Sequence, residues 1–371
     1  MIYFDSAASY PVLPEVQTRL KLTVNTLFGN PSAQHSAGEM AANLVEQARE
    51  TIADAIGALP SEIIFTSGAT ESNNLAIKGH FSRPEYAQKR HMVISAIEHK
   101  CIHAIADYLM RTQNIAVTVV KPNTSGIIDT GAIREALRED TSLVSIMHVN
   151  NELGTINPIK SIGDLCLQHG VRFHTDAAQS FLKTDIDVDE FNLDYISLSG
   201  HKIGAMKGVG AVYIRDLRTS NIEPVIHGAG QEEGLRGGTL PAPIIESFHS
   251  AVQHFPAAYA VLKQKHYKAC LLNEIRRLGV ECAQNGESID SLISLTLPAT
   301  DVAALIRSES EEFALSTGSA CSSKEIEVSH VLQAIGLSRD DGSRTLRISF
   351  HHQLEEGDIL KLAETIKSFS E

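Results

Sequence analysis

The stretch Ile63-Ile64-Phe65-Thr66-Ser67-Gly68-Ala69-Thr70 joins a short apolar run to a glycine-containing turn, and an apolar pattern with helical spacing follows it. We expect a buried strand that leads directly into the first turn of a helix. The backbone N–H groups of such a turn, together with a hydroxyl, point toward an anion as phosphate sites require. The same residues are equally compatible with an ordinary loop.

Apolar runs of the same kind alternate with helical patterns from about residue 40 to residue 215. Helical spacing is seen in segments 41–56, 131–138 and 159–169. The strand-like runs are 63–65, 92–94, 117–120, 143–147, 171–173, 195–198 and 210–214. This alternation predicts an α/β fold with a mainly parallel, seven-stranded sheet and helices on both of its faces.

The rest of the chain predicts a second, smaller α/β domain. Its expected elements are helices at 258–278 and 300–307 and strands at 292–297 and 346–349. A chain of 371 residues also exceeds what one compact core usually holds. We therefore predict a large domain over 15–255 and a small domain made of 1–14 and 256–371.

The composition excludes several classes of protein. The chain has 32 Lys+Arg against 45 Asp+Glu, a formal net charge of −13, which disfavours direct binding to nucleic acid. No apolar run approaches the ~18 residues of a membrane span, and the first residues lack the features of a signal peptide. The five cysteines are scattered and form no CxxC pair, which favours a reducing, cytoplasmic location over a disulfide framework.

Polar residues follow five of the predicted strands directly. Because ligands bind at the carboxyl ends of the strands in open α/β sheets, these residues predict one shared site. The polar segments are 66–74, 98–100, 148–152, 174–179 and 199–202.

Three features of this predicted site match the requirements of pyridoxal phosphate. The turn at 67–70 would hold the phosphate, Asp176 would keep the pyridine nitrogen protonated, and Lys202 would carry the aldehyde. Taken singly, each feature has an ordinary explanation, since Asp176 could cap a helix and Lys202 could be a solvated surface lysine. Their occurrence together favours the cofactor.

The segment His99-Lys100-Cys101-Ile102-His103 alternates histidine with cysteine. If a helix begins here, His99 and His103 share a face and Cys101 points roughly the opposite way, which disfavours a metal site. We expect no metal, and either a cofactor-stacking or acid–base role for His99 or simple helix capping.

Cys321 lies in the segment Leu315-Ser316-Thr317-Gly318-Ser319-Ala320-Cys321-Ser322-Ser323, among small and polar residues. Such surroundings favour a reactive thiol over a structural one. Cys166 and Cys270 have apolar neighbours and are expected in the core.

Ordered motifs along the whole chain resemble those of the cysteine desulfurases in the class-V aminotransferase family. They include Phe4-Asp5-Ser6-Ala7-Ala8, Gly29-Asn30-Pro31-Ser32, Glu98-His99-Lys100, Asp176-Ala177-Ala178-Gln179, Ser199-Gly200-His201-Lys202, Arg236-Gly237-Gly238-Thr239, Gly318-Ser319-Ala320-Cys321 and Arg347-Ile348-Ser349. Segments 66–74 and 148–154 also match.

The resemblance implies a fold-type-I, pyridoxal-phosphate-dependent homodimer. Lys202 would hold the cofactor, Asp176 would pair with its pyridine nitrogen, and His99 would stack on its ring and assist proton transfers. Asn30 and Arg347 would bind the substrate carboxylate. The remaining cofactor contacts of the same chain would come from Asn151, Gln179, Ala69, Thr70, Ser199 and His201. Thr239 of the partner subunit would add a contact to the phosphate.

The activity implied by the resemblance is removal of sulfur from L-cysteine. L-Alanine would be released and a persulfide on Cys321 would pass to acceptor proteins for iron–sulfur cluster assembly, tRNA thiolation or DNA sulfur modification. The alternatives are a selenocysteine lyase or another class-V enzyme, and a silent docking scaffold.

Three departures from the family pattern suggest a specialised member of the family. The family's Gly-Pro-Lys-Gly is replaced by Gly204-Ala205-Met206-Lys207-Gly208. The arginine that ends the family's Gly-Gly-Gly-Gln-Glu-Arg is replaced by Glu233. The usual Ser-Leu-Gly-Arg is replaced by Ser349-Phe350-His351-His352. None of the three removes a residue with a predicted chemical role.

Overall fold

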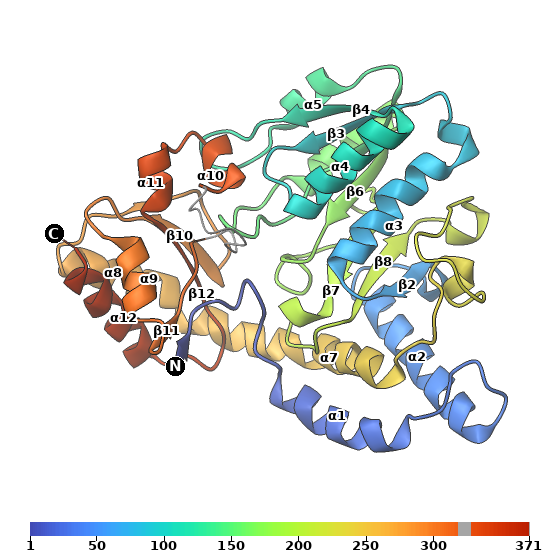
Figure 1. Ribbon diagram of the computed structural model, residues 1–371, viewed down its shortest axis with the longest axis horizontal. Helices are drawn as coiled ribbons and strands as arrows, with labels where there is room; N and C mark the ends of the chain where they lie inside the picture. Colours follow the sequence, from blue (N-terminus) through green and yellow to red (C-terminus); the bar gives the residue numbers. More distant parts are fainter. Residues whose placement is uncertain (318–327, 371) are drawn as a thin grey trace.

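The computed structural model of the chain describes residues 1–317 and 328–370. A large sheet with helices on both sides occupies one end of the molecule, and a smaller group of strands and helices occupies the other (Figure 1). The N-terminus lies beside this smaller group (Figure 1).

The large sheet has seven strands in the order β2-β8-β7-β6-β5-β3-β4. Only β8 runs against its neighbours, since it pairs antiparallel with both β2 and β7. The expected seven-stranded, mainly parallel sheet is therefore confirmed. The strands are β2 (Ile63–Thr66), β3 (His91–Ser95), β4 (Ala116–Val120), β5 (Thr141–Ser145), β6 (Arg172–Asp176), β7 (Tyr195–Ser199) and β8 (Gly210–Ile214).

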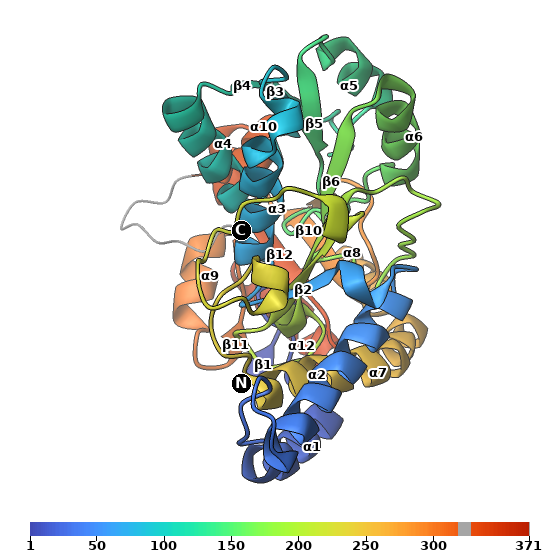
Figure 2. The ribbon, with the colours of Figure 1, turned by 90° about the vertical axis from the view of Figure 1, so that its right-hand side faces the viewer.

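Helices cover both faces of this sheet, as the views in Figures 1 and 2 show. One face packs against α3 (Ala69–Ser82) and α4 (Lys100–Gln113), whose apolar residues form a cluster with Ile64, Met92 and Val212. The other face packs in the main core with α2 (Ser36–Asp54), α5 (Thr130–Ala136), α6 (Ile159–His169) and α7 (Ala242–Lys265). Burial on both faces explains why these strands are continuously apolar rather than alternating.

The smaller group is built on a three-stranded antiparallel sheet, with β10 (Leu292–Thr296) between β12 (Thr345–Ser349) and β9 (Ala283–Gln284). The N-terminal β1 (Ile2–Tyr3) pairs with β11 (Phe313–Ala314), so the first residues of the chain join this smaller group. The surrounding helices are α8 (Tyr267–Arg277), α9 (Val302–Ser308), α10 (His330–Ala334), α11 (Arg339–Ser343) and α12 (Glu356–Ser368).

Helix α7 differs from the sequence-based expectation. It runs unbroken through the predicted boundary at 255. The N-terminal helix α1 (Pro14–Thr26), far from α7 in the sequence, packs against it. The helix expected over 258–278 is interrupted at His266, which adopts φ 48° and separates α7 from α8. The division into two domains stays a prediction.

Two smaller findings concern the cysteines and the membrane. Cys166 is buried as expected, but Cys270 is only partly buried and packs against the edge of the core. Within residues 1–317 and 328–370, no helix has both the length and the apolar character needed to span a bilayer.

A buried ion pair fixes the loop that follows β8 against β2. The guanidinium of Arg49 donates to both carboxylate oxygens of Glu232, at 2.7 and 3.0 Å, and the backbone N–H of Phe65 also donates to Glu232. Glu232 has φ 50°, an unusual conformation for a residue other than glycine. The pair therefore positions the strand that leads into the turn at 67–70.

We expect Glu232→Ala to destabilise the protein by about 3 kcal/mol, because it removes the buried carboxylate from Arg49 and leaves only the exposed Glu46 as its partner. Urea unfolding followed by circular dichroism should show the transition at lower urea. Arg138→Ala, which removes the exposed pair with Asp140, is the control and should cost less than about 1 kcal/mol. Equal shifts for the two variants would contradict the structural role of Glu232.

Candidate active site

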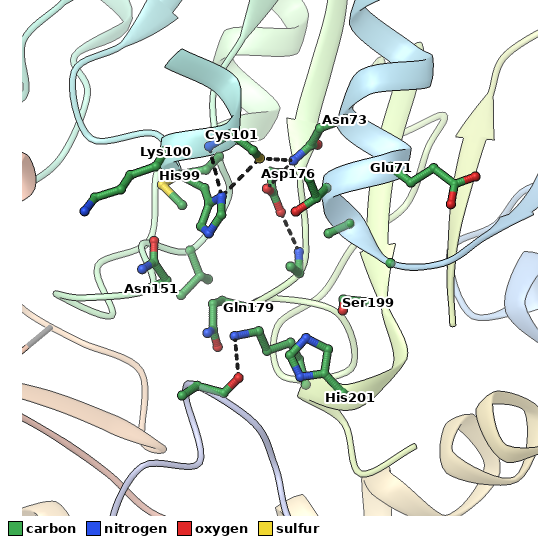
Figure 3. Close-up of a pocket in the computed structure, with 18 of the residues that line it drawn as sticks. Glu71, Asn73, His99, Lys100, Cys101, Asn151, Asp176, Gln179, Ser199 and His201 are labelled. Carbon is green, nitrogen blue, oxygen red and sulfur yellow. Dashed lines mark hydrogen bonds between the residues drawn. The ribbon is translucent and has the colours of Figure 1, made fainter. Parts of the chain in front are cut away.

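A cavity of about 570 Å³ lies at the carboxyl ends of β2, β3, β5, β6 and β7. Most of the residues predicted to form the site line this cavity, and Figure 3 shows how several of them face one another. They are Ala69, Thr70, His99, Asn151, Asp176, Gln179, Ser199, His201, Lys202 and Arg347.

The turn between β2 and α3 forms one end of the cavity. Gly68 caps α3 with φ 151°, a conformation that favours glycine, and a side chain here would project into open space. Strand β8 approaches this turn so closely that a Cβ on Gly210 would lie 2.6 Å from the Cα of Gly68. Because the first N–H groups of a helix have no acceptor within it, α3 presents donors to an anion here.

Asp176 ends β6 and is almost fully buried. Both of its carboxylate oxygens accept hydrogen bonds, one from Asn73 Nδ2 at 2.8 Å and the other from the backbone N–H of Ala178 at 2.9 Å. These donors fix the plane of the carboxylate at the cavity wall. The carboxylate keeps lone pairs that can accept from one further donor, and a protonated ring nitrogen would be such a donor.

Lys202 lies in the short 3-10 turn Gly200–Lys202 that follows β7. Its Nζ donates to the backbone oxygens of Ala7 and Ala8, at 2.6 and 3.0 Å. Burial, with the nearby Arg347 charge adding to it, lowers the pKa of the Lys202 amine to about 8. The amine is therefore closer to its nucleophilic, uncharged form than an ordinary lysine at neutral pH.

The Ala7 carbonyl also accepts from the amide Nε2 of Gln179, at 2.6 Å. The other end of that amide, Oε1, accepts from Nζ of the buried Lys183 at 3.2 Å. Burial lowers the pKa of Lys183 to about 7. Gln179 is thus held at both ends, between the N-terminal segment and a second buried lysine.

His99 caps α4 rather than lying on it, and this decides the direction of Cys101. The His99 side chain folds back so that Nδ1 accepts from the backbone N–H of Cys101. The Cys101 thiol lies 3.0 Å from the same nitrogen and lines the cavity, instead of pointing the opposite way. The opposite direction was expected only if His99 lies on the first helical turn, whereas the structure shows the capping role that the sequence had left open.

Arg347 extends from β12 to the side of the cavity that faces Asn151. Its guanidinium donates to Asp5 Oδ1 at 2.7 Å and to the backbone oxygen of Asn151 at 3.1 Å. The residue is almost fully buried. A guanidinium held in this way is suited to binding a carboxylate, as predicted for the substrate.

Two of the predicted site residues, Asn30 and Thr239, do not line the cavity of the single chain. Asn30 is exposed, and its side chain accepts from the backbone N–H of Ser32. Thr239 is also exposed, on the segment held to the cavity rim by the ion pair between Arg236 and Glu71. Cys321 lies outside the described residues. The roles of all three stay predictions.

Several residues of the site were not predicted from the sequence. Asn73 lies within the segment 66–74, but only its contact with Asp176 gives it a role. Lys183 follows the segment 174–179 by one helical turn, a spacing that could have revealed it. Within the described part of the chain, no group of three or more His, Cys, Asp or Glu residues is placed to hold a metal ion.

Comparison with known proteins shows the family of the chain. The sequence matches the aminotransferase class-V family over residues 2–362. It is 39% identical over 367 residues to the cysteine desulfurase IscS of Rickettsia felis, covering 96% of this chain and 88% of that protein. A solved structure described as SspA in complex with cysteine is 45% identical, with a TM-score of 0.85 and coverage of 94% of this chain and 99% of that one. A NifS-like protein is 30% identical, with a TM-score of 0.90 and coverage of 99% and 98%.

The chain therefore belongs to the class-V aminotransferase family, and the predicted fold-type-I architecture is confirmed. Within this family it belongs to the cysteine desulfurases, and it is an enzyme. Membership of this family implies pyridoxal phosphate as the cofactor.

The lowered pKa of Lys202 can be measured in the cofactor-free protein. Acetylation of Lys202, followed by mass spectrometry of its peptide, should reach half its maximal rate near pH 8. In the urea-denatured chain the same residue should do so near the ordinary lysine value of about 10.4. A folded-state midpoint close to that of the denatured chain would contradict the described burial of the amine.

Proposed function

We propose that the protein removes sulfur from L-cysteine with pyridoxal phosphate, releases L-alanine and leaves a persulfide on Cys321. One observation carries this proposal. A helix N-terminus, Asp176, Lys202 and Arg347 converge on a single cavity in a chain of the cysteine desulfurase family. The four groups would bind, in that order, the cofactor phosphate, its pyridine nitrogen, its aldehyde carbon and the substrate carboxylate.

The cavity fits the cofactor at three points. The α3 turn with Ser199 and His201 would hold the phosphate, Asp176 would pair with the pyridine nitrogen, and Lys202 would be the point of covalent attachment. Burial, with the Lys202 charge adding to it, lowers the pKa of His201 to about 4, so this histidine acts as a neutral hydrogen-bonding group. When bound, pyridoxal phosphate withdraws electrons from the α-carbon of an attached amino acid.

The chain's own residues then orient the substrate and move its protons. Arg347 would bind the L-cysteine carboxylate, with Asn30 as the second predicted contact. Lys202, with its lowered pKa, is suited to accept the proton lost from the α-carbon. His99 would pack against the cofactor ring, and Asn151 and Gln179 would bind near its edge.

The sulfur step is assigned to Cys321 on sequence grounds alone. Its thiolate would attack the substrate sulfur, so that an S–S bond forms and the substrate's C–S bond breaks. The electron pair of that bond stays with the carbon, which takes up a proton and leaves as L-alanine. Cys321 then carries the sulfur as a persulfide, with no external oxidant or reductant required.

The predicted partners are a second copy of the chain and a sulfur-accepting protein. Thr239 of the partner subunit would complete the phosphate site, which agrees with its exposed position in the single chain. The net charge of −13 favours transfer of sulfur to a protein over direct contact with nucleic acid. The acceptor could serve iron–sulfur assembly, tRNA thiolation or DNA sulfur modification. The cytoplasmic location expected from the cysteines stays a prediction.

The proposal predicts that the holoenzyme mixed with L-cysteine, without reductant, forms L-alanine and gains one sulfur atom on the peptide that contains Cys321. Amino-acid analysis and mass spectrometry of the peptide measure the two products. Alanine formation with unmodified Cys321 would favour the alternative of lyase chemistry, as in a selenocysteine lyase. Absence of alanine would contradict the proposed activity.

Cys321→Ser should bind L-cysteine and change the cofactor absorbance as the parent enzyme does, yet form no persulfide. The reason is that the hydroxyl cannot take the sulfur, while the binding groups in the cavity are untouched. Cys270→Ser, which changes a thiol outside the cavity, is the matched control and should behave like the parent. Normal sulfur transfer by Cys321→Ser would remove this residue from the mechanism.

A further inference from the structure

A second thiol, that of Cys101, lies inside the cavity between two groups of the site. Cys101 is the second residue of α4, and its Sγ is 3.0 Å from Nδ1 of His99 and 3.3 Å from Nδ2 of Asn73. Figure 3 shows Cys101 joined by dashed lines to His99 on one side and to Asn73 on the other, with Asp176 beside them. The proposed reaction gives this thiol no role, since sulfur transfer is assigned to Cys321.

The backbone determines which nitrogen of His99 carries the proton. The N–H of Cys101 donates to Nδ1 at 3.2 Å, so that nitrogen must accept. A neutral imidazole with Nδ1 as its acceptor carries its hydrogen on Nε2. The side chain of His99 is exposed to the open cavity, and the partial loss of solvation there lowers its pKa, which favours this neutral ring.

The direction of the thiol hydrogen bond follows from its neighbours. The NH₂ group of Asn73 donates to Asp176 Oδ2 at 2.8 Å and to Sγ of Cys101, so the sulfur accepts on that side. The side chain of Thr70 also hydrogen-bonds to the thiol. Burial, with the Asp176 charge adding to it, raises the pKa of Cys101 to about 11, so the thiol keeps its hydrogen at neutral pH. The single lone pair of Nδ1 already accepts from the backbone N–H of Cys101, so the S–H group donates to it by sharing that lone pair in a bifurcated hydrogen bond.

We propose that Cys101 is a positioning residue: Asn73 holds its thiol beside Asp176, and the thiol is a second donor to Nδ1 of His99 that further stabilises the neutral imidazole, whose proton the backbone N–H already directs to Nε2. The residue that would pair with the cofactor nitrogen and the residue that would stack on the cofactor ring are then joined through Asn73 and Cys101. This inference rests on the proposed function for its consequence in catalysis, but its hydrogen bonds belong to the chain itself.

Other charged and titratable groups also act on His99. Asp176 and Glu152 raise the pKa of its imidazole, whereas Lys202 and His330 lower it. A donor on Nδ1 stabilises only the neutral ring, so removal of the thiol should raise the pKa of His99. The other four groups remain in place in a variant of Cys101, which isolates the contribution of the thiol.

The test compares Cys101→Ala, which removes the donor, with Cys101→Ser, which keeps a donor at the same position. Cys282→Ala, outside the cavity, controls for the loss of a thiol. In cofactor-free protein labelled with ¹⁵N-histidine, long-range ¹H–¹⁵N spectra recorded against pH report the tautomer and the pKa of His99, and a His99→Gln spectrum assigns its signals. Thermal unfolding first establishes that each variant is folded.

The His99 pKa should rise in Cys101→Ala and stay near the parent value in Cys101→Ser and Cys282→Ala. In the holoenzyme, kcat for L-alanine formation should fall about 3- to 10-fold in Cys101→Ala, as loss of one hydrogen bond predicts, with KM little changed. The serine variant should recover most of this loss.

An unchanged His99 pKa in Cys101→Ala, or a serine variant that behaves like the alanine variant in both measurements, would overturn the proposal. If the parent enzyme forms no alanine from L-cysteine, the proposed function fails, but the titration of the cofactor-free protein still decides the role of Cys101. The two failures are therefore distinguishable.

Discussion

The site depends on one backbone carbonyl, that of Ala7, which accepts from both Lys202 and Gln179. The segment that carries this carbonyl is tied to β12, because the N–H of Ala7 donates to Ser349 Oγ and the Ser6 hydroxyl donates to the carbonyl of Phe350. The N-terminal residues thus join the smaller sheet to the lysine at the centre of the cavity. Without this segment, Lys202 and Gln179 would lose the acceptor that they share.

Loss of solvation sets the charge state of most groups around the cavity. It lowers the pKa values of Lys202, His99 and His201 and raises that of Cys101. The carboxylate of Asp176 is held in place by two donors, Nδ2 of Asn73 and the backbone N–H of Ala178. The Asp176 carboxylate therefore presents a fixed acceptor at the buried wall of the cavity, close to Lys202 and Cys101. This is the environment that a protonated ring nitrogen needs if it is to keep its proton.

The sequence was sufficient to predict the large sheet and most of the cavity lining, because each strand end carries polar side chains with a recognisable chemistry. It was insufficient where the contact involves the backbone of a distant segment. Nothing in the type of residue at Ala7 indicates that its carbonyl meets Lys202 across 195 residues of chain. The sequence also left the direction of Cys101 open for a local reason, since helical periodicity does not apply to a capping residue such as His99. Asn30, Thr239 and Cys321 could be placed only by resemblance, and their roles remain to be tested.

Helix α7 has a mechanical consequence for the whole molecule. Its 24 residues form a rod of about 36 Å that contributes to the core beside the large sheet and ends near the smaller one. Any rotation of the large sheet relative to the smaller group must bend this helix or change the backbone at one of its ends. Pro256 lies within it and cannot donate a hydrogen bond to the preceding turn, so the rod has a point of lower bending stiffness one residue beyond position 255.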